Sequence, residues 1–334
     1  MMCLFKKLSA FFTASLMLGV TAVSNSVHAY ENAAQVESFV SEMTRRHGFS
    51  EAQLRQVLND ATRQQPILDA ISRPAEKVRQ WKEYRPIFLT PERIGQGVEF
   101  WRKNAAALAR AEREYGVPAQ VIVAIIGVET FFGRNTGKWR VIDALTTLGF
   151  DYPPRAPFFR NELKEFLLLA REQQIDPLSV VGSYAGAMGL PQFMPSSYRA
   201  YAVDFDGDAY TNIWSNPTDA IGSVASYFHR HGWVQGDPVV VRAQLNGARA
   251  LEGLTVGLEP TASVADLRAL GWVPVSPVNN NYAVTTFRLE GEAGEEFWMG
   301  LPNFYVITRY NRSVMYALAV YQLSEAMRAQ YQGR

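Results

Sequence analysis

The segment Val121–Phe132 constrains the fold of this chain more than any other feature. It is almost wholly apolar, and Glu129 is the only charged residue between Glu114 and Arg134. A proline suits the first turn of a helix, and the density of apolar residues predicts a helix, Pro118–Phe132, that is buried on most sides.

The same segment carries the first candidate for chemistry. A carboxylate near the end of a buried helix is partly desolvated, which favours its neutral form and raises its pKa. A carboxylic acid that stays protonated near neutral pH can donate its proton to a glycosidic oxygen. Spacing alone leaves a second interpretation open, in which Glu129 pairs with an arginine or points to solvent at the helix end.

The N-terminus has the pattern of an exported protein. Lys6 and Lys7 precede a short apolar stretch, which leads to small residues before a cleavage site after Ala29. This order predicts a signal peptide over residues 1–29. Cys3, the only cysteine, lies ahead of the apolar stretch. We therefore expect no lipid anchor, and a mature chain without disulfides.

Composition limits the partners of the mature chain. Without Lys6 and Lys7, the 33 basic residues fall to 31, against 32 acidic ones. This balance gives no support for nucleic-acid binding or for strong attraction to a membrane surface. We expect no membrane span in the mature chain and a monomer. With 48% hydrophobic residues, the 334-residue chain is long enough for two or more subdomains.

Helical patterns dominate the first two thirds of the chain. Residues 30–116 form one helical domain, with an irregular arm over Ile71–Pro86. Residues 117–235 form a second block with more loops. The helices expected in the two blocks, besides Pro118–Phe132, are Ala34–Arg46, Ser50–Gln64 (Ser50 as N-cap, Gln53 completing a capping box), Pro91–Tyr115, Val141–Leu148, Phe158–Gln173, Pro195–Tyr201 and Asp219–His231.

Short β-branched segments replace helical patterns over residues 236–305. They predict a small β domain, which Leu267–Trp272 interrupts as part of a short helix capped by Ser263. Residues 306–334 return to a helix, Ser313–Arg328. The fold class is therefore mainly α (α+β). The expected strands are Pro238–Leu245, Glu252–Pro260, Val273–Pro277, Ala283–Leu289 and Glu295–Leu301.

A glycine-rich segment over residues 182–198 predicts a tight loop that lines a cleft, because glycine permits close approach and unusual backbone angles. Its polar side chains are candidates for the cleft and its apolar ones for the walls. An irregular buried connection between helices is the alternative. The polar candidates are Ser183, Tyr184 and Gln192, and the apolar ones include Met188 and Phe193.

An aspartate-rich segment, 204–219, resembles the start of a calcium-binding EF-hand loop. Clustered carboxylates repel one another unless a hard cation lies among them, although a solvated acidic turn remains the alternative. The match is incomplete, because Ala209 replaces the usual glycine and Ser215 the usual glutamate. The candidate ligands of a Ca²⁺ ion are Asp204, Asp206, Asp208, the carbonyl of Tyr210, and Asp219.

Near the C-terminus, Tyr310 and Asn311 precede the last expected helix, with Tyr316 in its first turns. Asn311 could bind a sugar amide or hold the acid, or it could cap the helix, which is the commoner use of asparagine at such a position.

Several motifs occur together in one order. They are Val128-Glu-Thr-Phe-Phe-Gly133, Gly186-Ala-Met-Gly189 with Gln192-Phe-Met-Pro-Ser-Ser197, the aspartate-rich loop with Asp219-Ala-Ile, Tyr310-Asn311, and upstream Tyr84-Arg-Pro-Ile-Phe-Leu-Thr and Val98-Glu-Phe-Trp101. This order resembles the family B lytic murein transglycosylases over roughly residues 35–325. The resemblance implies a lysozyme-like core with an added helical domain and a small β domain.

The resemblance also assigns roles. It implies that Glu129 is a single catalytic acid/base, that Ser183 and Gln192 lie beside it, and that the aspartate-rich loop is a structural calcium site. It implies that Tyr227, Tyr310, Asn311 and Tyr316 line the sugar groove. An extra residue between Trp214 and Asp219, relative to the family form, leaves the register of the last ligand open.

The implied reaction cleaves the β-1,4 bond between N-acetylmuramic acid and N-acetylglucosamine in peptidoglycan and forms a 1,6-anhydromuramyl end. No second carboxylate accompanies the cleft motifs; the nearest in sequence is Asp143. No cofactor is expected for catalysis. The partners are peptidoglycan strands and, beyond them, cell-wall synthesis proteins, and the location is the periplasm. The alternatives are a muramidase that admits water, a non-catalytic wall-binding protein, and a calcium-regulated adaptor.

Overall fold

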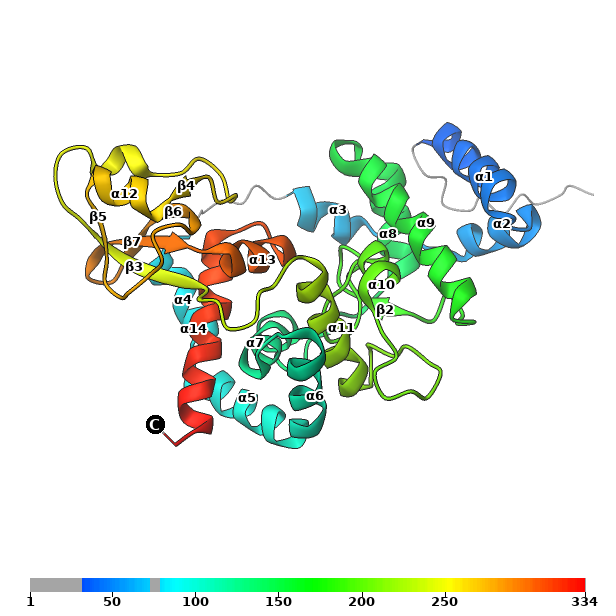
Figure 1. Cartoon of the computed structure of the whole chain (residues 1–334). Coiled ribbons are helices and arrows are strands. Elements are labelled where there is room, and N and C mark those ends of the chain that lie inside the picture. Colours follow the sequence, from blue (N-terminus) through cyan, green and yellow to red (C-terminus); the bar gives the residue numbers. More distant parts are fainter. Residues whose placement is uncertain (1–31, 73–78, 334) are drawn as a thin grey trace, which may run out of the picture.

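The computed structural model describes residues 32–72 and 79–333, so the predicted signal peptide lies outside the described residues. Helices build most of this structure, and one small sheet lies near the C-terminal end of the chain (Figure 1). The predicted mainly α (α+β) class is confirmed. Within these ranges, no helix combines the length and the apolar character needed to cross a membrane.

Among the residues that the structure describes, six helices precede the buried segment. They are α1 (Ala33–His47), α2 (Glu51–Asp60), α3 (Gln65–Ser72), α4 (Trp81–Phe88), α5 (Pro91–Lys103) and α6 (Ala105–Tyr115). Ser50 caps α2, and its hydroxyl accepts the N–H of Gln53 at 3.4 Å. That helix ends at Asp60, earlier than expected.

Two expectations for this region are wrong. The helix Pro91–Tyr115 is interrupted at Asn104, which ends α5 and begins α6; its side-chain amide donates to the carbonyl of Phe100 at 2.8 Å. The irregular arm over Ile71–Pro86 contains most of α4 and the end of α3. Neither a glycine nor a proline lies at Asn104, so the sequence pattern did not predict the helix break there.

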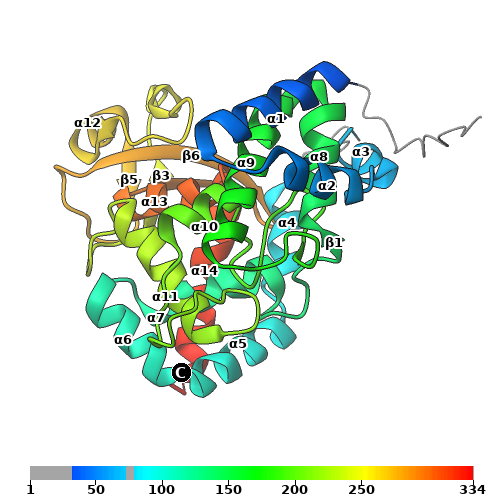
Figure 2. The ribbon, with the colours of Figure 1, turned by 90° about the vertical axis from the view of Figure 1, so that its right-hand side faces the viewer.

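The buried segment forms α7 (Ala119–Thr130), and every residue from Val121 to Gly127 is buried. The C-terminal helix α14 (Val314–Tyr331) packs along it, together with α5 and α11 (Pro217–Arg230). Figure 2 shows α14 running through the middle of this group. The last helix of the chain therefore closes the core around the first candidate residue.

A second group of helices follows α7. It comprises α8 (Val141–Asp151), the 3-10 helix η1 (Pro153–Arg155), α9 (Ala156–Glu172) and α10 (Pro195–Tyr201). The short strands β1 (Trp139–Arg140) and β2 (Val181–Gly182), which the pattern did not predict, pair antiparallel beside it. Asp143 fastens the N-terminal segment to this group, because its carboxylate accepts the N–H of Thr62 at 2.8 Å and pairs with Arg140 at 2.8 Å.

The strand-rich segment forms a five-stranded sheet in the order β4-β6-β7-β3-β5. Its strands are β3 (Val240–Leu245), β4 (Ala262–Ser263), β5 (Trp272–Pro274), β6 (Ala283–Gly291) and β7 (Gly294–Gly300). The helix α12 (Val264–Leu270) covers one side, with Ser263 as its N-cap. A separate hydrophobic cluster around Trp272 and Met299 supports this unit.

Two predictions for this segment need correction. The expected strand Glu252–Pro260 is instead the 3-10 helix η2 (Ala250–Gly253) followed by a loop. A helix that was not expected, α13 (Pro302–Tyr310), crosses the boundary drawn at residue 305. It connects the sheet to α14.

Candidate active site

Glu129 lies in the last turn of α7 and is partly exposed. Its Oε1 accepts a hydrogen bond from the hydroxyl of Tyr316 at 2.5 Å. Among the described residues it forms no ion pair, so no described arginine is its partner. Its immediate surroundings are the apolar end of α7 and a group of tyrosines.

Burial raises the pKa of the Glu129 carboxyl to about 7, and the hydrogen bond from Tyr316 opposes the rise. The position at the C-terminal end of α7 acts in the same direction as burial, because the helix dipole disfavours a negative charge there. Burial also raises the pKa values of Tyr84 and Tyr310, and the nearby Glu129 carboxylate adds to both shifts. A large fraction of the Glu129 carboxyl is therefore expected to be protonated near neutral pH.

A strained elbow follows Glu129. Phe131 and Phe132 both have positive φ angles, 52° and 60°, which non-glycine residues adopt only at a cost. The ring of Phe132 fixes the conformation of this turn. It occupies space that is free because Gly127 and Gly97 have no side chains. A Cβ atom at Gly127 would lie 2.6 Å from Cζ of Phe132, and one at Gly97 would lie 2.9 Å from it.

Thr130 connects the elbow to the glycine-rich loop. Its Oγ1 lies 3.0 Å from the carbonyl oxygen of Leu190 and 3.1 Å from that of Ile126, and it accepts the N–H of Gly133 at 3.0 Å. Its side chain is fully buried. The loop is thus fixed directly beside the carboxylate.

The glycine-rich loop folds back on itself. Met188 and Phe193 exchange two backbone hydrogen bonds of 2.8 and 3.0 Å, and their side chains are buried. They support the loop and offer almost no surface to a ligand, which differs from the cleft walls that the sequence predicted. Gln192, at φ 51°, donates to the carbonyl of Thr136 at 3.2 Å. Ser183 Oγ accepts the N–H of Ala187 at 3.0 Å.

The predicted groove residues fall into two sets. Tyr227 and Tyr310 contact each other edge to face at 4.8 Å, and their hydroxyls donate to the carbonyls of Arg309 and Pro191. Tyr184 and Asn311 are exposed. Asn311 ends α13, and Ser313, not Asn311, caps α14.

Among the residues that the structure describes, no second carboxylate contributes to the pKa of Glu129. Asp143, the nearest carboxylate in sequence, is buried and engaged by Arg140 and Thr62. Sequence patterns do not single out Tyr84 or Thr130, although both lie in motifs that resemble the family. A tyrosine beside a proline-rich stretch or a threonine after the acid carries no distinctive signal of its own.

The aspartate-rich loop brings three carboxylates together. Oxygen atoms of Asp204, Asp206 and Asp219 lie within 4.8 Å of one another, whereas Asp208 does not belong to this group. The carboxyl pKa of Asp219 is raised by burial and by the two neighbouring aspartates. Ala209 has φ 74°, a conformation that suits the glycine usual at this position. Three close carboxylates fit a hard cation such as Ca²⁺.

Comparisons with known proteins show the family to which the chain belongs. A family model described as "Transglycosylase SLT domain" matches residues 31–325. The chain belongs to this family, and it is a lytic transglycosylase of family B. It is 47% identical over 307 residues to membrane-bound lytic murein transglycosylase B of Escherichia coli K12, covering 89% of this chain and 84% of the relative.

Solved structures give the same result. Soluble lytic transglycosylase SltB1 from Pseudomonas aeruginosa matches with a TM-score of 0.86 and 66% identity over 90% of this chain and 100% of its own. Escherichia coli Slt35 in complex with calcium matches with a TM-score of 0.82 and 47% identity, over 90% of this chain and 95% of its own. The more distant P. aeruginosa SltB3, in complex with NAG-anhNAM-pentapeptide, matches with a TM-score of 0.79 and 28% identity. The match covers 89% of this chain and 80% of SltB3.

The elbow generates a prediction. Gly127→Ala gains helix propensity of about 1 kcal/mol but forces the ring of Phe132 to move, at about 1–3 kcal/mol. We expect a net loss of stability of at most about 2 kcal/mol. We also expect a loss of kcat of roughly 100-fold, because small displacements of a reacting group are costly. Urea denaturation and initial rates of wall digestion measure the two effects.

Gly95→Ala is the matched control. A Cβ atom at Gly95, on α5, would meet nothing within 4 Å, so this variant should keep wild-type activity. Equal activity of the two variants would contradict the role of the elbow.

Proposed function

We propose that this enzyme cleaves the β-1,4 bond between N-acetylmuramic acid and N-acetylglucosamine in peptidoglycan, with Glu129 as its only acid/base. The observation that carries the proposal is a single carboxyl group whose pKa is raised to about 7, with no carboxylate of the described residues among the causes of the shift. The names of the relatives, a murein transglycosylase among them, support the substrate.

In the first step, protonated Glu129 donates its proton to the glycosidic oxygen. The bond from this oxygen to C1 of the muramyl residue breaks, and N-acetylglucosamine leaves with a free hydroxyl. The 2-acetamido group of the substrate stabilises the positive charge at C1. Tyr316 holds Oε1, so the other carboxyl oxygen is the proton donor.

In the second step, the carboxylate of Glu129 takes the proton from the C6 hydroxyl of the same muramyl residue. The freed oxygen attacks C1 and closes the 1,6-anhydro ring, so the reaction consumes no water. Ordinary glycosidases place two carboxyl groups around the bond. The described surroundings of Glu129 supply only its own carboxyl group, which favours this route over a muramidase that admits water.

The predicted groove residues complete the proposal. We assign sugar contacts to the partly or fully exposed side chains near the loop and support to the enclosed ones. The contact set is Ser183, Tyr184, Gln192, Tyr310 and Asn311, and the support set is Met188, Phe193, Tyr227 and Tyr316. The catalytic reaction requires no metal or cofactor in this scheme.

A Ca²⁺ ion is proposed as a structural ligand of the aspartate-rich loop. Asp204, Asp206, Asp208, the carbonyl of Tyr210, and Asp219 would hold it. Asp219 reaches Asp204 and Asp206 despite the extra residue before it. The calcium complex of Slt35 supports this assignment. We also propose export through the predicted signal peptide to the periplasm.

Digestion of purified sacculi tests the reaction. The wild type should release 1,6-anhydromuramyl products, which are one water lighter than hydrolysis products, whereas Glu129→Gln should lose roughly 10³-fold or more in rate because it has no proton to donate. Mass spectrometry of the products is the measurement. Hydrated products alone from the wild type would overturn the proposal.

A measurement of the free energy of unfolding tests whether the rate loss of Glu129→Gln comes from unfolding. The folded-state pKa of Glu129 lies above its unfolded value, so the ionised carboxylate destabilises the fold increasingly as pH rises from about 4.5 to 7. Glutamine removes that cost. Glu129→Gln should therefore exceed the wild type in stability at pH 8, by roughly 1–3 kcal/mol after solvent screening, and match it near pH 4.

Calcium generates a separate prediction. Saturating Ca²⁺ at 100 times its dissociation constant should stabilise the wild type by about 2.7 kcal/mol. Asp206→Asn should lose most of this gain, whereas the control Asp69→Asn, on the surface of α3, should keep it.

Ala209→Gly should relieve the positive-φ strain and add about 0.5–1 kcal/mol to the free energy of unfolding. Thermal melts with Ca²⁺ and with a chelator measure these effects, and identical melts for the wild type would sink the assignment.

A further inference from the structure

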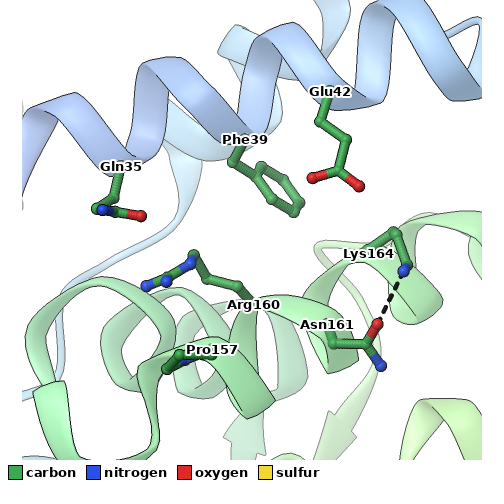
Figure 3. A pocket seen from close by; sticks show the side chains of 7 residues that line it. All are labelled: Gln35, Phe39, Glu42, Pro157, Arg160, Asn161 and Lys164. Atoms are coloured by element: carbon green, nitrogen blue, oxygen red, sulfur yellow. Dashed lines mark hydrogen bonds between the residues drawn. The ribbon is translucent and has the colours of Figure 1, made fainter.

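The helix α9 carries polar side chains on two sides. Toward α1, Arg160, Asn161 and Lys164 line a hollow of about 250 Å³, where Lys164 donates to the side-chain amide oxygen of Asn161 at 2.8 Å (Figure 3). Glu162 contacts α10 instead, and only 2% of its surface is exposed. A buried carboxylate is costly unless hydrogen bonds compensate for the lost water, so its partners indicate its role.

Glu162 holds the first turn of α10, which packs against α9 (Figure 1). Its Oε2 accepts the backbone N–H of Ser196 at 2.9 Å, and its Oε1 accepts the hydroxyl of the same residue at 2.7 Å. The N-cap residue, Met194, provides no side-chain hydrogen bond, and Pro195 has no backbone N–H. The carboxylate from α9 therefore replaces the cap that a helix usually receives from its own N-cap side chain.

The residues before α10 belong to the glycine-rich loop beside Glu129, which is fixed at two further points. Thr130 fixes it at Leu190, because its Oγ1 lies 3.0 Å from the carbonyl oxygen of that residue. The two backbone hydrogen bonds between Met188 and Phe193 fix it again. The cap from α9 is the third fixed point, at the end of the loop.

Gln192 lies between these points and Ser196. Its side-chain amide donates to the carbonyls of Thr136 at 3.2 Å and Gly189 at 2.9 Å, and its φ angle is 51°. A non-glycine residue keeps such a strained backbone only where the surrounding contacts hold it. The conformation of Gln192 therefore depends on the end of the loop as well as on its start.

We propose that Glu162 is a positioning residue for substrate binding, which holds the end of the loop so that Gln192 keeps its conformation. This inference rests on the proposed function, because that function makes Gln192 a sugar contact. Without the carboxylate, the N–H and the hydroxyl of Ser196 lose their partners, and the first turn of α10 moves toward other acceptors. A sugar contact that is made equally in the ground state and the transition state affects KM and not kcat.

Glu162→Leu tests the cap, because leucine fills a similar volume but accepts no hydrogen bond. We expect KM for soluble peptidoglycan strands to rise roughly tenfold and kcat to stay within about twofold of the wild type. Initial rates over a range of strand concentrations give KM and kcat, and urea denaturation gives the folded fraction.

Two further variants serve as controls. Glu162→Gln is the conservative variant, because its amide can accept the N–H of Ser196 and donate to the hydroxyl oxygen, so KM should stay within about twofold of the wild type. Arg199, three residues further along α10, also fastens that helix to α9, because it pairs with Glu172 at 2.7 Å and with Glu165. Arg199→Ala removes these pairs without touching the cap and should change neither KM nor kcat.

A rise in KM for Glu162→Leu that Glu162→Gln avoids supports the inference. Wild-type KM in Glu162→Leu overturns it, and so does an equal rise in Glu162→Gln or Arg199→Ala. A loss of kcat alone that follows the folded fraction also overturns it, because the cap would then serve stability only.

If Glu162→Leu does not fold, Ser196→Ala decides, since it loses only the hydroxyl bond. A rise in KM of roughly threefold then supports the inference, and a wild-type KM overturns it. Hydrated products alone from the wild type would reject the proposed reaction, whereas the comparison of KM values tests the cap in either case.

Discussion

The desolvation of one carboxylate organises this protein. Glu129 lies at the end of a helix that is buried from Val121 to Gly127, where the ionised form is disfavoured and the pKa rises to about 7. A structure that only needed stability would place a neutral residue there. The surrounding tyrosines supply a hydroxyl partner without supplying a counter-charge, so a large fraction of the acid is protonated near neutral pH and the group still has a fixed position.

Fixed position comes from packing on both sides of α7. Phe132 fills the space left at Gly97 and Gly127, which holds the strained elbow, and Thr130 ties the elbow to the glycine-rich loop. The C-terminal helix then brings Tyr316 to the carboxylate. Segments from three distant parts of the sequence must therefore fold together before the acid acquires its raised pKa. Stability and reactivity depend on the same contacts.

Periodicity and motif order predicted the class, the family and most helices, because long amphipathic or buried segments leave a clear pattern. They did not predict the break at Asn104, because no glycine or proline marks it. They placed Met188 and Phe193 on a cleft wall, whereas side-chain direction in an irregular loop depends on tertiary contacts. The sequence likewise did not predict that Tyr316 would be the hydrogen-bond partner of Glu129, because tertiary packing decides which of several tyrosines reaches the carboxylate.

The central claim concerns the protonation state of Glu129, and a direct titration tests it. The side-chain carboxyl carbon of Glu129 can be followed by NMR as pH changes, with Glu129→Gln used to assign its resonance. The account predicts a midpoint near 7. A midpoint near 4.5, the ordinary value for a glutamate, would contradict it.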